Sequence, residues 1–356
     1  MNYDAILVVS FGGPESREDV IPFLETVLRG KNVPRERLLT VAEHYYHCGG
    51  KSPINQQTRE LIAALEQELA RHDLKQHDPK QHGPKLPVYW GNRNWHPMLA
   101  ETLQQMKQDG IRRALAFVTS AYSSYSGCRQ YRENIIAAQN QVGPGAPEID
   151  KLRAFFNHPG FVDAIEERLR DAMAQVPEHA RKNVQIVYTA HSIPQSMANT
   201  SDYVRQLEEV RKLVSARLGV TNDALVYQSR SGAPGQPWLE PDILDHLRQV
   251  KARDLASAVV LAPISFISDH MEVLYDLDIE AQQLCDSLGL PMVRAKTVGV
   301  HPKFVAMIRE LILERTMGVE RRAVGSLGAR QDMCAEDCCP APQRPMRPLA
   351  ASPRGA

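Results

Sequence analysis

The sequence predicts an α/β protein of two similar halves, in which helices flank parallel sheets. Segments typical of strands alternate with segments typical of helices over most of the 356 residues, and they form two sets that meet near residues 155–180. Strands separated by helices imply right-handed crossovers between parallel neighbours. With 43% hydrophobic and 24% charged residues, the chain has the composition of an ordinary globular protein, and its length suggests about two domains.

The first set of elements lies before residue 155. The apolar run Ala5–Phe11 has the length of a buried parallel strand and ends in Gly12-Gly13-Pro14. Apolar residues recur at spacings of three and four over 20–28, which predicts an amphipathic helix. Similar patterns predict helices over 56–71 and 97–107 and strands over Pro87–Trp90 and Ala114–Thr119. Residues 74–85 are polar, contain two prolines and a glycine, and are expected to form a loop.

The second set begins near residue 184. The pattern predicts strands over Val184–Thr189, Ala224–Gln228, Ala258–Ile264 and Met292–Ala295, and helices near 203–218, 243–250, after Ser268 and over 302–316. From about Gly318 the composition changes to arginine, alanine, proline and glycine, for which we expect a poorly ordered tail. The expected domains are therefore 1–155, 156–317 with the metal site, and a tail at 318–356 that contains cysteines.

Charge and hydropathy exclude several classes of protein. The 42 basic residues equal the 42 acidic ones, so no net field attracts nucleic acid. No window approaches eighteen apolar residues, which argues against a transmembrane helix, and the short N-terminal apolar run is wrongly flanked for a signal peptide. We expect a cytoplasmic protein, a monomer or a weak dimer, and leave peripheral contact with a membrane open.

Two strand ends carry unusual polar groups. The predicted strand ending at Thr189 continues into His191, and the strand ending at Ile264 continues into a segment with Glu272. Each residue alone is at least as often structural or solvated as functional. Ligands of parallel sheets, however, bind at the carboxyl ends of the strands, and both residues follow such ends. They are therefore predicted site residues.

Glu272 begins a series of carboxylates with Asp276 and Glu280. A spacing of four brings the three side chains roughly onto one helix face, and more nearly so if the helix widens toward π geometry. Like charges at this spacing destabilise a helix, and residues 269–280 contain no lysine or arginine to neutralise them. The row is either a solvated face or a path for hard cations and protons, and we favour the path.

At this point a resemblance to the ferrochelatase family becomes specific. The segments around His191 and Glu272 look like the two signature segments of that family. Three other stretches resemble it in the same order, and the match covers about residues 3 to 316. The five segments are Ser10-Phe11-Gly12-Gly13-Pro14-Glu15, Gly49-Gly50-Lys51-Ser52-Pro53-Ile54, Thr189-Ala190-His191-Ser192-Ile193-Pro194, Gln228-Ser229-Arg230-Ser231-Gly232 with Trp238-Leu239-Glu240-Pro241, and Ser268-Asp269-His270-Met271-Glu272-Val273-Leu274-Tyr275-Asp276.

The resemblance implies two four-stranded parallel sheets with a porphyrin in a cleft between the halves. It implies a lyase that inserts Fe²⁺ into the porphyrin without ATP, in haem biosynthesis. His191 and Glu272 would be catalytic and would hold the metal, with Asp276 and Glu280 as metal ligands behind them. Two pyrrole protons must leave as the iron enters, and an imidazole and a carboxylate suit both the base and the ligand.

The resemblance also implies where the porphyrin lies. It places Arg29, Tyr45, Ser52 and Tyr131 around the propionates and the ring edge. Phe11 stands where some relatives have a tyrosine facing the metal, and a phenyl ring cannot ligate iron. The segment 31–37 is short and charged, whereas relatives that use protoporphyrin IX tend to carry an apolar lip there. We therefore favour coproporphyrin III as substrate.

Three of the six cysteines crowd the C-terminal segment, at Cys334, Cys338 and Cys339. Some ferrochelatases carry a [2Fe–2S] cluster on such cysteines and one distant partner, and a cluster requires four thiolates. Cys128, which follows a predicted strand end, is the fourth ligand we expect. Free thiols on a disordered tail, or zinc, remain the alternative.

Two other functions stay open at this stage. A cobalt or nickel chelatase of another tetrapyrrole would share the fold and the His/Glu chemistry. A protein that carries a tetrapyrrole without acting on it is the alternative that is not an enzyme. The chain lacks a Gly-x-x-x-x-Gly-Lys-Ser/Thr motif, which disfavours an ATP-driven chelatase.

Overall fold

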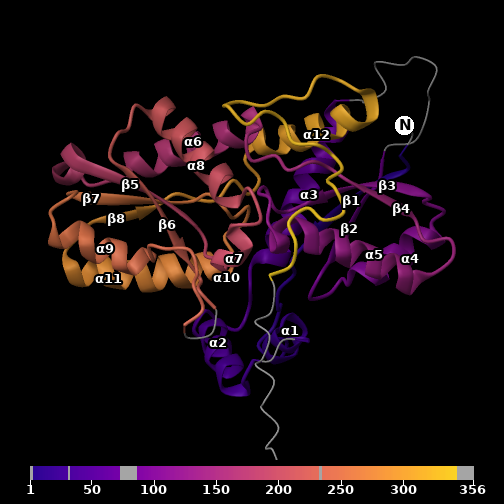
Figure 1. Cartoon of the computed structure of the whole chain (residues 1–356), viewed down its shortest axis with the longest axis horizontal. Coiled ribbons are helices and arrows are strands. Elements are labelled where there is room, and N and C mark those ends of the chain that lie inside the picture. Colours follow the sequence, from indigo (N-terminus) through magenta and orange to yellow (C-terminus); the bar gives the residue numbers. More distant parts are fainter. Residues whose placement is uncertain (1–2, 31–32, 73–85, 232–234, 343–356) are drawn as a thin grey trace, which may run out of the picture.

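Two parallel four-stranded sheets form the body of the protein. The computed structural model describes residues 3–30, 33–72, 86–231 and 235–342, so the loop expected over 74–85 lies outside the described residues. The strand orders are β2-β1-β3-β4 and β6-β5-β7-β8, and every pairing is parallel. The two orders are the same when each half is numbered from its own first strand. The predicted fold class is thus confirmed, and the halves lie side by side (Figure 1).

The N-terminal half contains the strands β1 Ala5–Ser10, β2 Val88–Asn92, β3 Arg113–Val118 and β4 Glu148–Lys151. Its helices are α1 Val20–Val27, α2 Arg35–His47, α3 Ile54–Arg71, α4 Leu99–Gln108, the π-helix η1 Tyr125–Arg129 and α5 Gln130–Val142. The strand β1 is buried along its whole length, as its continuous apolar run predicts.

The C-terminal half contains β5 Val184–His191, β6 Asp223–Gln228, β7 Ala258–Pro263 and β8 Met292–Arg294. Its helices are α6 Pro159–Ala174, the 3₁₀ helix η2 Glu178–Asn183, α7 Gln195–Ala198, α8 Tyr203–Leu218, α9 Ile243–Ala252, α10 Met271–Val273, the π-helix η3 Leu274–Ala281, α11 Gln282–Leu288 and α12 Pro302–Met317.

One hydrophobic core joins the two halves. Phe117 of β3, Phe155, Phe161 of α6 and Phe304 of α12 are fully buried and contact one another, with ring centroids 5.3–6.2 Å apart. The same core continues to the inner faces of β1 and β5. Because this core is shared, the halves cannot move apart without exposing it, which fixes the two sheets relative to each other.

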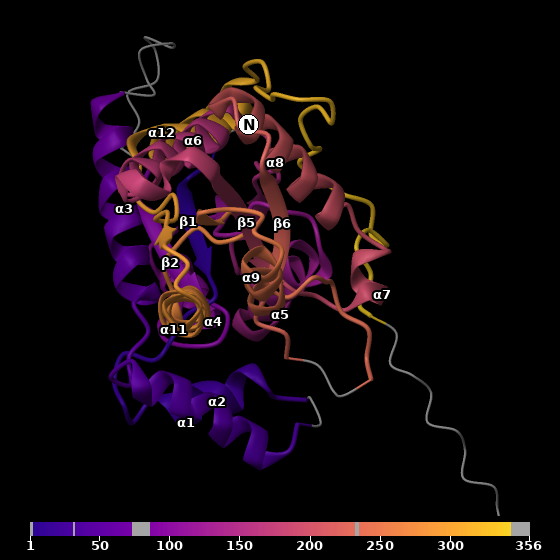
Figure 2. The same cartoon turned by 90° about the vertical axis from the view of Figure 1, so that its left-hand side faces the viewer.

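The helices α1 and α2 lie away from both sheets, at the bottom of the molecule in the view of Figure 2. They have a small core of their own, built on Phe23, Leu24 and Leu38. Among the helices of the described residues, none is long and apolar enough to cross a membrane.

The segment after α12 differs from the poorly ordered tail that we expected. Residues 318–342 run back across the middle of the molecule (Figure 1). Asn157 donates to the carbonyl of Gly328 (2.7 Å), and Glu209 accepts from the backbone amides of Ser326 and Leu327. Side chains of other elements thus hold this segment by its backbone amides and carbonyls. The composition of the segment does not reveal such contacts. Residues 343–356 lie outside the described residues.

Candidate functional site

His191 and Glu272 lie at the carboxyl ends of two adjacent strands. His191 is the last residue of β5, and Glu272 lies in α10, which follows β7 after a short loop. Because β5 and β7 are hydrogen-bonded neighbours, their ends bring the two side chains together. His191 Nε2 is 3.6 Å from Glu272 Oε2, and the side chains are 31% and 46% exposed. Solvent therefore reaches both side chains of the pair.

The backbone around His191 fixes the orientation of its ring. Its Nδ1 lies in hydrogen-bond contact with the carbonyl of Ser192, and a carbonyl can only accept. Nδ1 therefore carries a proton, and Nε2 is the nitrogen that faces Glu272. The backbone of His191 is held as well, since its amide donates to Ser265 Oγ (2.9 Å) and its carbonyl accepts from the Tyr203 hydroxyl (3.0 Å).

The two groups shift each other's pKa in opposite directions. Burial alone would lower the pKa of His191, but the nearby Glu272 carboxylate raises it above its usual value. Burial alone would raise the pKa of Glu272, but His191 outweighs it and lowers that pKa to about 2, with a smaller effect from His270. The proton of the pair is therefore held by the imidazole.

The carboxylate row continues on the π-helix η3. Asp276 lies beside Glu272, and both Asp276 and Glu280 belong to η3. A π-helix has more residues per turn than an α-helix, so residues spaced by four come nearer to one face. Burial raises the pKa of Asp276 to about 7, with Glu272 and Glu280 adding to it and a hydrogen bond from Ser229 opposing it. Burial also raises the pKa of Glu280.

Ser229 reaches Asp276 from an unusual backbone conformation. Its φ of 63° lies in the left-handed region, which residues other than glycine rarely adopt. The Ser229 hydroxyl donates to Asp276 Oδ2, and Gln228 Nε2 donates to the Glu272 carbonyl (2.8 Å). The end of β6 thus holds the beginning of the carboxylate row.

The residues that the resemblance places around a porphyrin lie on the N-terminal half. Phe11, which follows β1, and Tyr131 of α5 are bridged by the Arg93 guanidinium, 5.6 Å and 4.4 Å from the two ring centroids. Ser52 is buried and donates its backbone amide to Pro14 (2.9 Å). Arg29 is exposed just beyond the end of α1.

Tyr45 connects the two groups of residues. It lies on α2, with its ring centroid 6.0 Å from that of Phe23. Burial raises the pKa of its hydroxyl, and the Glu272 carboxylate raises it further. A second bridge between the halves is the stacking of His44 on Tyr275 of η3, with centroids 3.9 Å apart.

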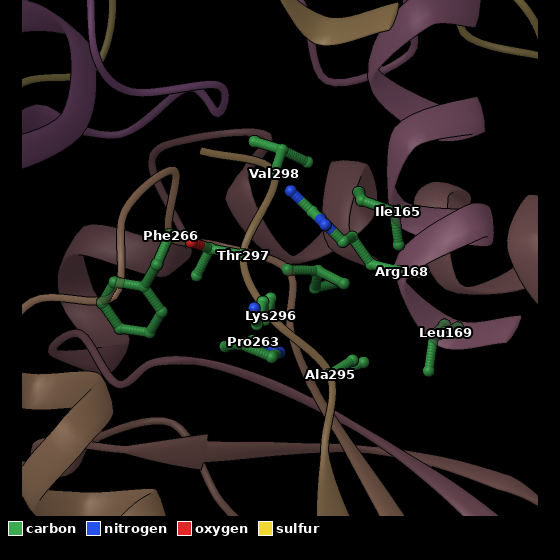
Figure 3. A pocket seen from close by; sticks show the side chains of 11 residues that line it. Ile165, Arg168, Leu169, Pro263, Phe266, Ala295, Lys296, Thr297 and Val298 are labelled. Atoms are coloured by element: carbon green, nitrogen blue, oxygen red, sulfur yellow. The ribbon is translucent and has the colours of Figure 1, made fainter. Parts of the chain in front are cut away.

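Two cavities differ in their relation to this site. A cavity of about 390 Å³ is lined by Arg17, by residues of α2 that include Glu43 and His44, and by Tyr275 of η3. The other cavity is enclosed by Arg168, Phe266 and Thr297 among others, and its volume of about 10 Å³ fits at most one water molecule (Figure 3). Only the first has room for a ligand.

The four cysteines of the predicted cluster come close together. The Sγ atoms of Cys338 and Cys339 are 3.5 Å apart. Burial raises the pKa of Cys334 and of Cys339, and in both cases Cys338 and Cys128 raise it further. Over the described ranges, no three His, Cys, Asp or Glu side chains form a ready-made metal site, so the thiols are neighbours without being arranged as ligands.

Several side chains of the site were missed by sequence reasoning. Tyr203, Ser265, His270 and Arg93 each contact a predicted site residue or its ring. Ser229 belonged to a segment quoted only for the resemblance. Strand ends signal where polar residues gather, but nothing in a single sequence indicates that Tyr203 of α8 reaches the backbone of His191.

The ferrochelatase family model matches residues 3–316. The chain belongs to the ferrochelatase family. It is a lyase that inserts Fe²⁺ into a porphyrin in haem biosynthesis, with iron and porphyrin as substrates. The chain is 54% identical to the ferrochelatase of Rhodopirellula baltica, over 96% of this chain and 95% of the relative. It is 50% identical to the coproporphyrin III ferrochelatase of Streptomyces coelicolor, over 98% and 96%.

Solved structures support the fold. The sirohydrochlorin chelatase SirB from Bacillus subtilis subspecies spizizenii, in complex with cobalt, matches 89% of this chain with 97% of its own, at a TM-score of 0.52 and 11% identity. SirB from Bacillus subtilis with Fe³⁺ matches 88% with 97%, at a TM-score of 0.54 and 14% identity. This likeness concerns the two-sheet architecture, whereas the high identity over nearly the whole length lies with ferrochelatases, which favours iron insertion over the cobalt and nickel alternative.

Proposed function

We propose that this ferrochelatase acts on coproporphyrin III, with His191 and Glu272 as the catalytic metal-binding pair. The observation that carries the site assignment is the 3.6 Å contact between His191 Nε2 and Glu272 Oε2, on two side chains that solvent reaches. Relatives named coproporphyrin III ferrochelatase, at 44–50% identity, support the substrate. So do the exposed charges of Arg35, Glu36 and Arg37 in the first turn of α2, because an apolar porphyrin edge would favour apolar residues there.

In the proposed reaction, His191 first releases to solvent the proton that its imidazole holds beside Glu272. Nε2 of His191 and the Glu272 carboxylate then hold Fe²⁺ while the porphyrin lies against the N-terminal half. Arg29 and Ser52 donate to propionates, and Tyr45 and Tyr131 border the ring. Each pyrrole N–H that is replaced by an Fe–N bond releases one proton, two for each haem formed. Asp276 has a pKa of about 7 and can accept and release a proton near neutral pH. We therefore route the protons through Asp276 and Glu280, which are also the outer metal ligands.

The substrate is tested by comparing coproporphyrin III with protoporphyrin IX in buffer without detergent. Coproporphyrin III is expected to give the higher kcat/KM. A preference for protoporphyrin IX would overturn the substrate and leave iron insertion standing. The site is tested with His191→Ala, which should abolish iron insertion while far-UV circular dichroism and the unfolding midpoint stay close to wild type. Near-normal turnover of that variant would refute the site assignment.

We also propose that Cys128, Cys334, Cys338 and Cys339 hold a [2Fe–2S] cluster. Two thiolates on one tetrahedral metal at about 2.3 Å lie roughly 3.8 Å apart, and the 3.5 Å between Cys338 and Cys339 Sγ is close to that value. Cys339 has a left-handed backbone (φ 49°), a conformation that non-glycine residues keep only where the surroundings enforce it. When bound, the cluster would supply a redox-active centre and a cross-link between η1 and the tail.

The cluster is tested on protein purified without oxygen. The protein is expected to be reddish-brown, with about two irons and two labile sulfides per chain. Serine at any of the four cysteines should remove the colour. Cys285→Ser is the matched control, because Cys285 is buried in α11 of the other half. Colourless wild-type protein would refute the cluster, and colour in Cys128→Ser would exclude Cys128 as a ligand.

A further inference from the structure

Gln57, in the first turn of α3, forms two hydrogen bonds across the boundary between the halves. Its Oε1 accepts from the backbone amide of Asp269 (2.9 Å), and its Nε2 donates to the backbone carbonyl of the same residue (3.2 Å). The two residues are 212 positions apart in the sequence. A primary amide offers a donor and an acceptor on one plane, so it pairs with the N–H and the C=O of one residue, as the backbone of a neighbouring strand would. Both bonds are partly buried, so water competes with them only in part.

On the C-terminal side, this contact holds the loop that carries the proposed metal ligand. Asp269 lies three residues before Glu272. Its carboxylate accepts from Arg294 (2.7 Å) and from the backbone amide of Thr297 (3.3 Å), so Asp269 is itself fixed to the end of β8 and to the segment that follows it. The position of Asp269 therefore determines where α10 begins and where the Glu272 side chain starts.

On the N-terminal side, the same turn of α3 is fixed to the porphyrin-facing loops. Buried Asn55 donates to the carbonyls of Gly13 and His96, at 3.2 Å each, and accepts from Asn92 Nδ2 (3.2 Å). Ser52, the proposed propionate donor, lies five residues before Gln57. A single helical turn thus connects the loops that face the porphyrin with the loop that carries the metal ligand.

We propose that Gln57 is a positioning residue for metal insertion. It sets the distance between the Asp269–Glu272 loop and the N-terminal half, so that the His191–Glu272 pair faces the centre of a porphyrin held by that half. This inference rests on the proposed site. Misplacing reacting groups by about 1 Å can cost two orders of magnitude in rate, so two hydrogen bonds at the boundary can matter without touching the substrate.

The test compares Gln57→Ala with Gln56→Ala. Gln56 is the neighbouring residue, is exposed, and pairs with Glu60 on its own helix (3.0 Å), so it matches Gln57 in type and helix position without crossing the boundary. In Gln57→Ala, kcat for iron insertion is expected to fall about tenfold. The porphyrin Kd, measured by fluorescence quenching, should stay within about twofold of wild type because the porphyrin contacts lie on the N-terminal half. Gln56→Ala should match wild type in both measurements.

A second pair of variants separates positioning from folding. Gln57→Met keeps the length of the side chain and removes both hydrogen bonds, so it should reproduce the loss of kcat even if Gln57→Ala does not fold. Gln57→Glu keeps the acceptor and loses the donor, and should fall at least as far, because its carboxylate faces the Asp269 carbonyl. A kcat within twofold of wild type in Gln57→Met, or a parallel loss of porphyrin affinity, would overturn the inference. If the Gln57 prediction fails while His191→Ala is inactive in the same assay, only the role of Gln57 is refuted, and the proposed site stands.

Discussion

The carboxylates of Glu272 and Asp276, four residues apart, have pKa values shifted in opposite directions. The pKa of Glu272 is about 2, because His191 stabilises its charge, whereas burial raises the pKa of Asp276 to about 7. Where the surroundings shift the pKa values of two neighbouring groups apart, one group typically acts as the acid and the other as the base. We assign the metal-binding role to Glu272 and the proton-relay role to Asp276 on this difference.

This division predicts graded effects of removing charge along the row. Glu272→Gln should reduce kcat nearly as much as His191→Ala, since it removes a ligand of the entering iron. Asp276→Asn and Glu280→Gln should only slow the reaction, by about 10–100-fold, which is the range for one general acid–base group. Steady-state kinetics with Fe²⁺ under nitrogen measures all four. An equal loss in every variant would contradict a layered path.

The raised pKa of Asp276 also predicts how stability depends on pH. Between about pH 4 and 7 the unfolded chain has an ionised Asp276 while the folded protein keeps it protonated, so the native state binds more protons and stability falls as pH rises. Asp276→Asn lacks this contribution. Its unfolding midpoint relative to wild type, both without metal, should therefore rise from pH 5 to pH 8. A difference that is flat over this range would mean that the carboxylate is not desolvated in the folded protein.

At the scale of single residues, the sequence indicated which side chains come together at the strand ends. His191 and Glu272 follow neighbouring parallel strands, and the spacing of Asp276 and Glu280 indicated a shared face. Arg93 and Tyr203 were out of reach because they come from other elements and contact the site through tertiary packing. Ser229 was out of reach because its role depends on a left-handed φ.

Among the elements, the helix α5 and the π-helix η1 bind the C-terminal segment, a role that no sequence pattern indicated. Arg132 of α5 donates to the carbonyls of Cys334 (3.4 Å), Ala335 (3.4 Å) and Glu336 (3.0 Å), and Arg129 of η1 donates to the carbonyl of Cys338 (3.3 Å). Two guanidinium groups thus hold the cysteine loop of the tail beside Cys128. They also bring positive charge to a place where thiolates would gather.

Removing one of these groups should loosen the cysteine loop. Arg132→Ala is expected to shorten the lifetime of the visible absorption of anaerobically purified protein in air, by about threefold or more, because three carbonyls lose their donor. Arg112→Ala, which removes an exposed arginine from the same half, is the control. If Arg132→Ala and wild type bleach at the same rate, Arg132 does not stabilise the loop.

Two of the elements that the sequence analysis did not predict share a physical cause. The strand β4 has only four residues, Glu148–Lys151, three of them charged, so it lacks an apolar run. The helix α2 is largely polar and buries only Leu38 and Ala42, and its first turn was read as a charged loop segment. Contacts with neighbouring elements stabilise both of them more than their own sequence patterns do, as is often the case at the edge of a fold.

For the whole molecule, a buried ion pair joins the C-terminal segment to the boundary of the two halves. Arg153 donates to both carboxylate oxygens of Glu314 on α12, at 2.7 and 2.9 Å, and to the carbonyl of Arg322 at 2.8 Å. The two charged side chains are 1% and 3% exposed. A charge left alone in such a place has neither water nor a counter-ion to stabilise it.

Glu314→Ala should therefore lower the free energy of unfolding by about 3–5 kcal/mol, the usual effect of breaking a buried pair. Asp245→Ala, which breaks an exposed pair with Arg248, should change it by at most about 1 kcal/mol. Urea unfolding followed by circular dichroism measures both. Similar small changes in the two variants would show that water reaches Arg153 in solution.

The whole fold was predictable to the level of its architecture. Alternating strand and helix patterns predicted two parallel α/β halves, because parallel strands need crossovers. The shared aromatic core between the halves was not predictable, since Phe117 and Phe304 are 187 residues apart and each is an ordinary apolar residue of its own element. The path of residues 318–342 depends on contacts between residues far apart in the sequence, among them hydrogen bonds to its backbone and the ion pairs Arg322–Glu310 and Arg330–Asp202.

That path has a consequence for the timing of biosynthesis. Arg129 and Cys338, which are hydrogen-bonded in the folded protein, are 209 residues apart in the chain. At translation rates of roughly 5–20 residues per second, about 10–40 s pass between their synthesis. Throughout this interval Cys128 stands on a surface whose partner segment does not yet exist. Any group shared by the four thiols can therefore be bound only after the segment with Cys334, Cys338 and Cys339 has been made, well after Cys128.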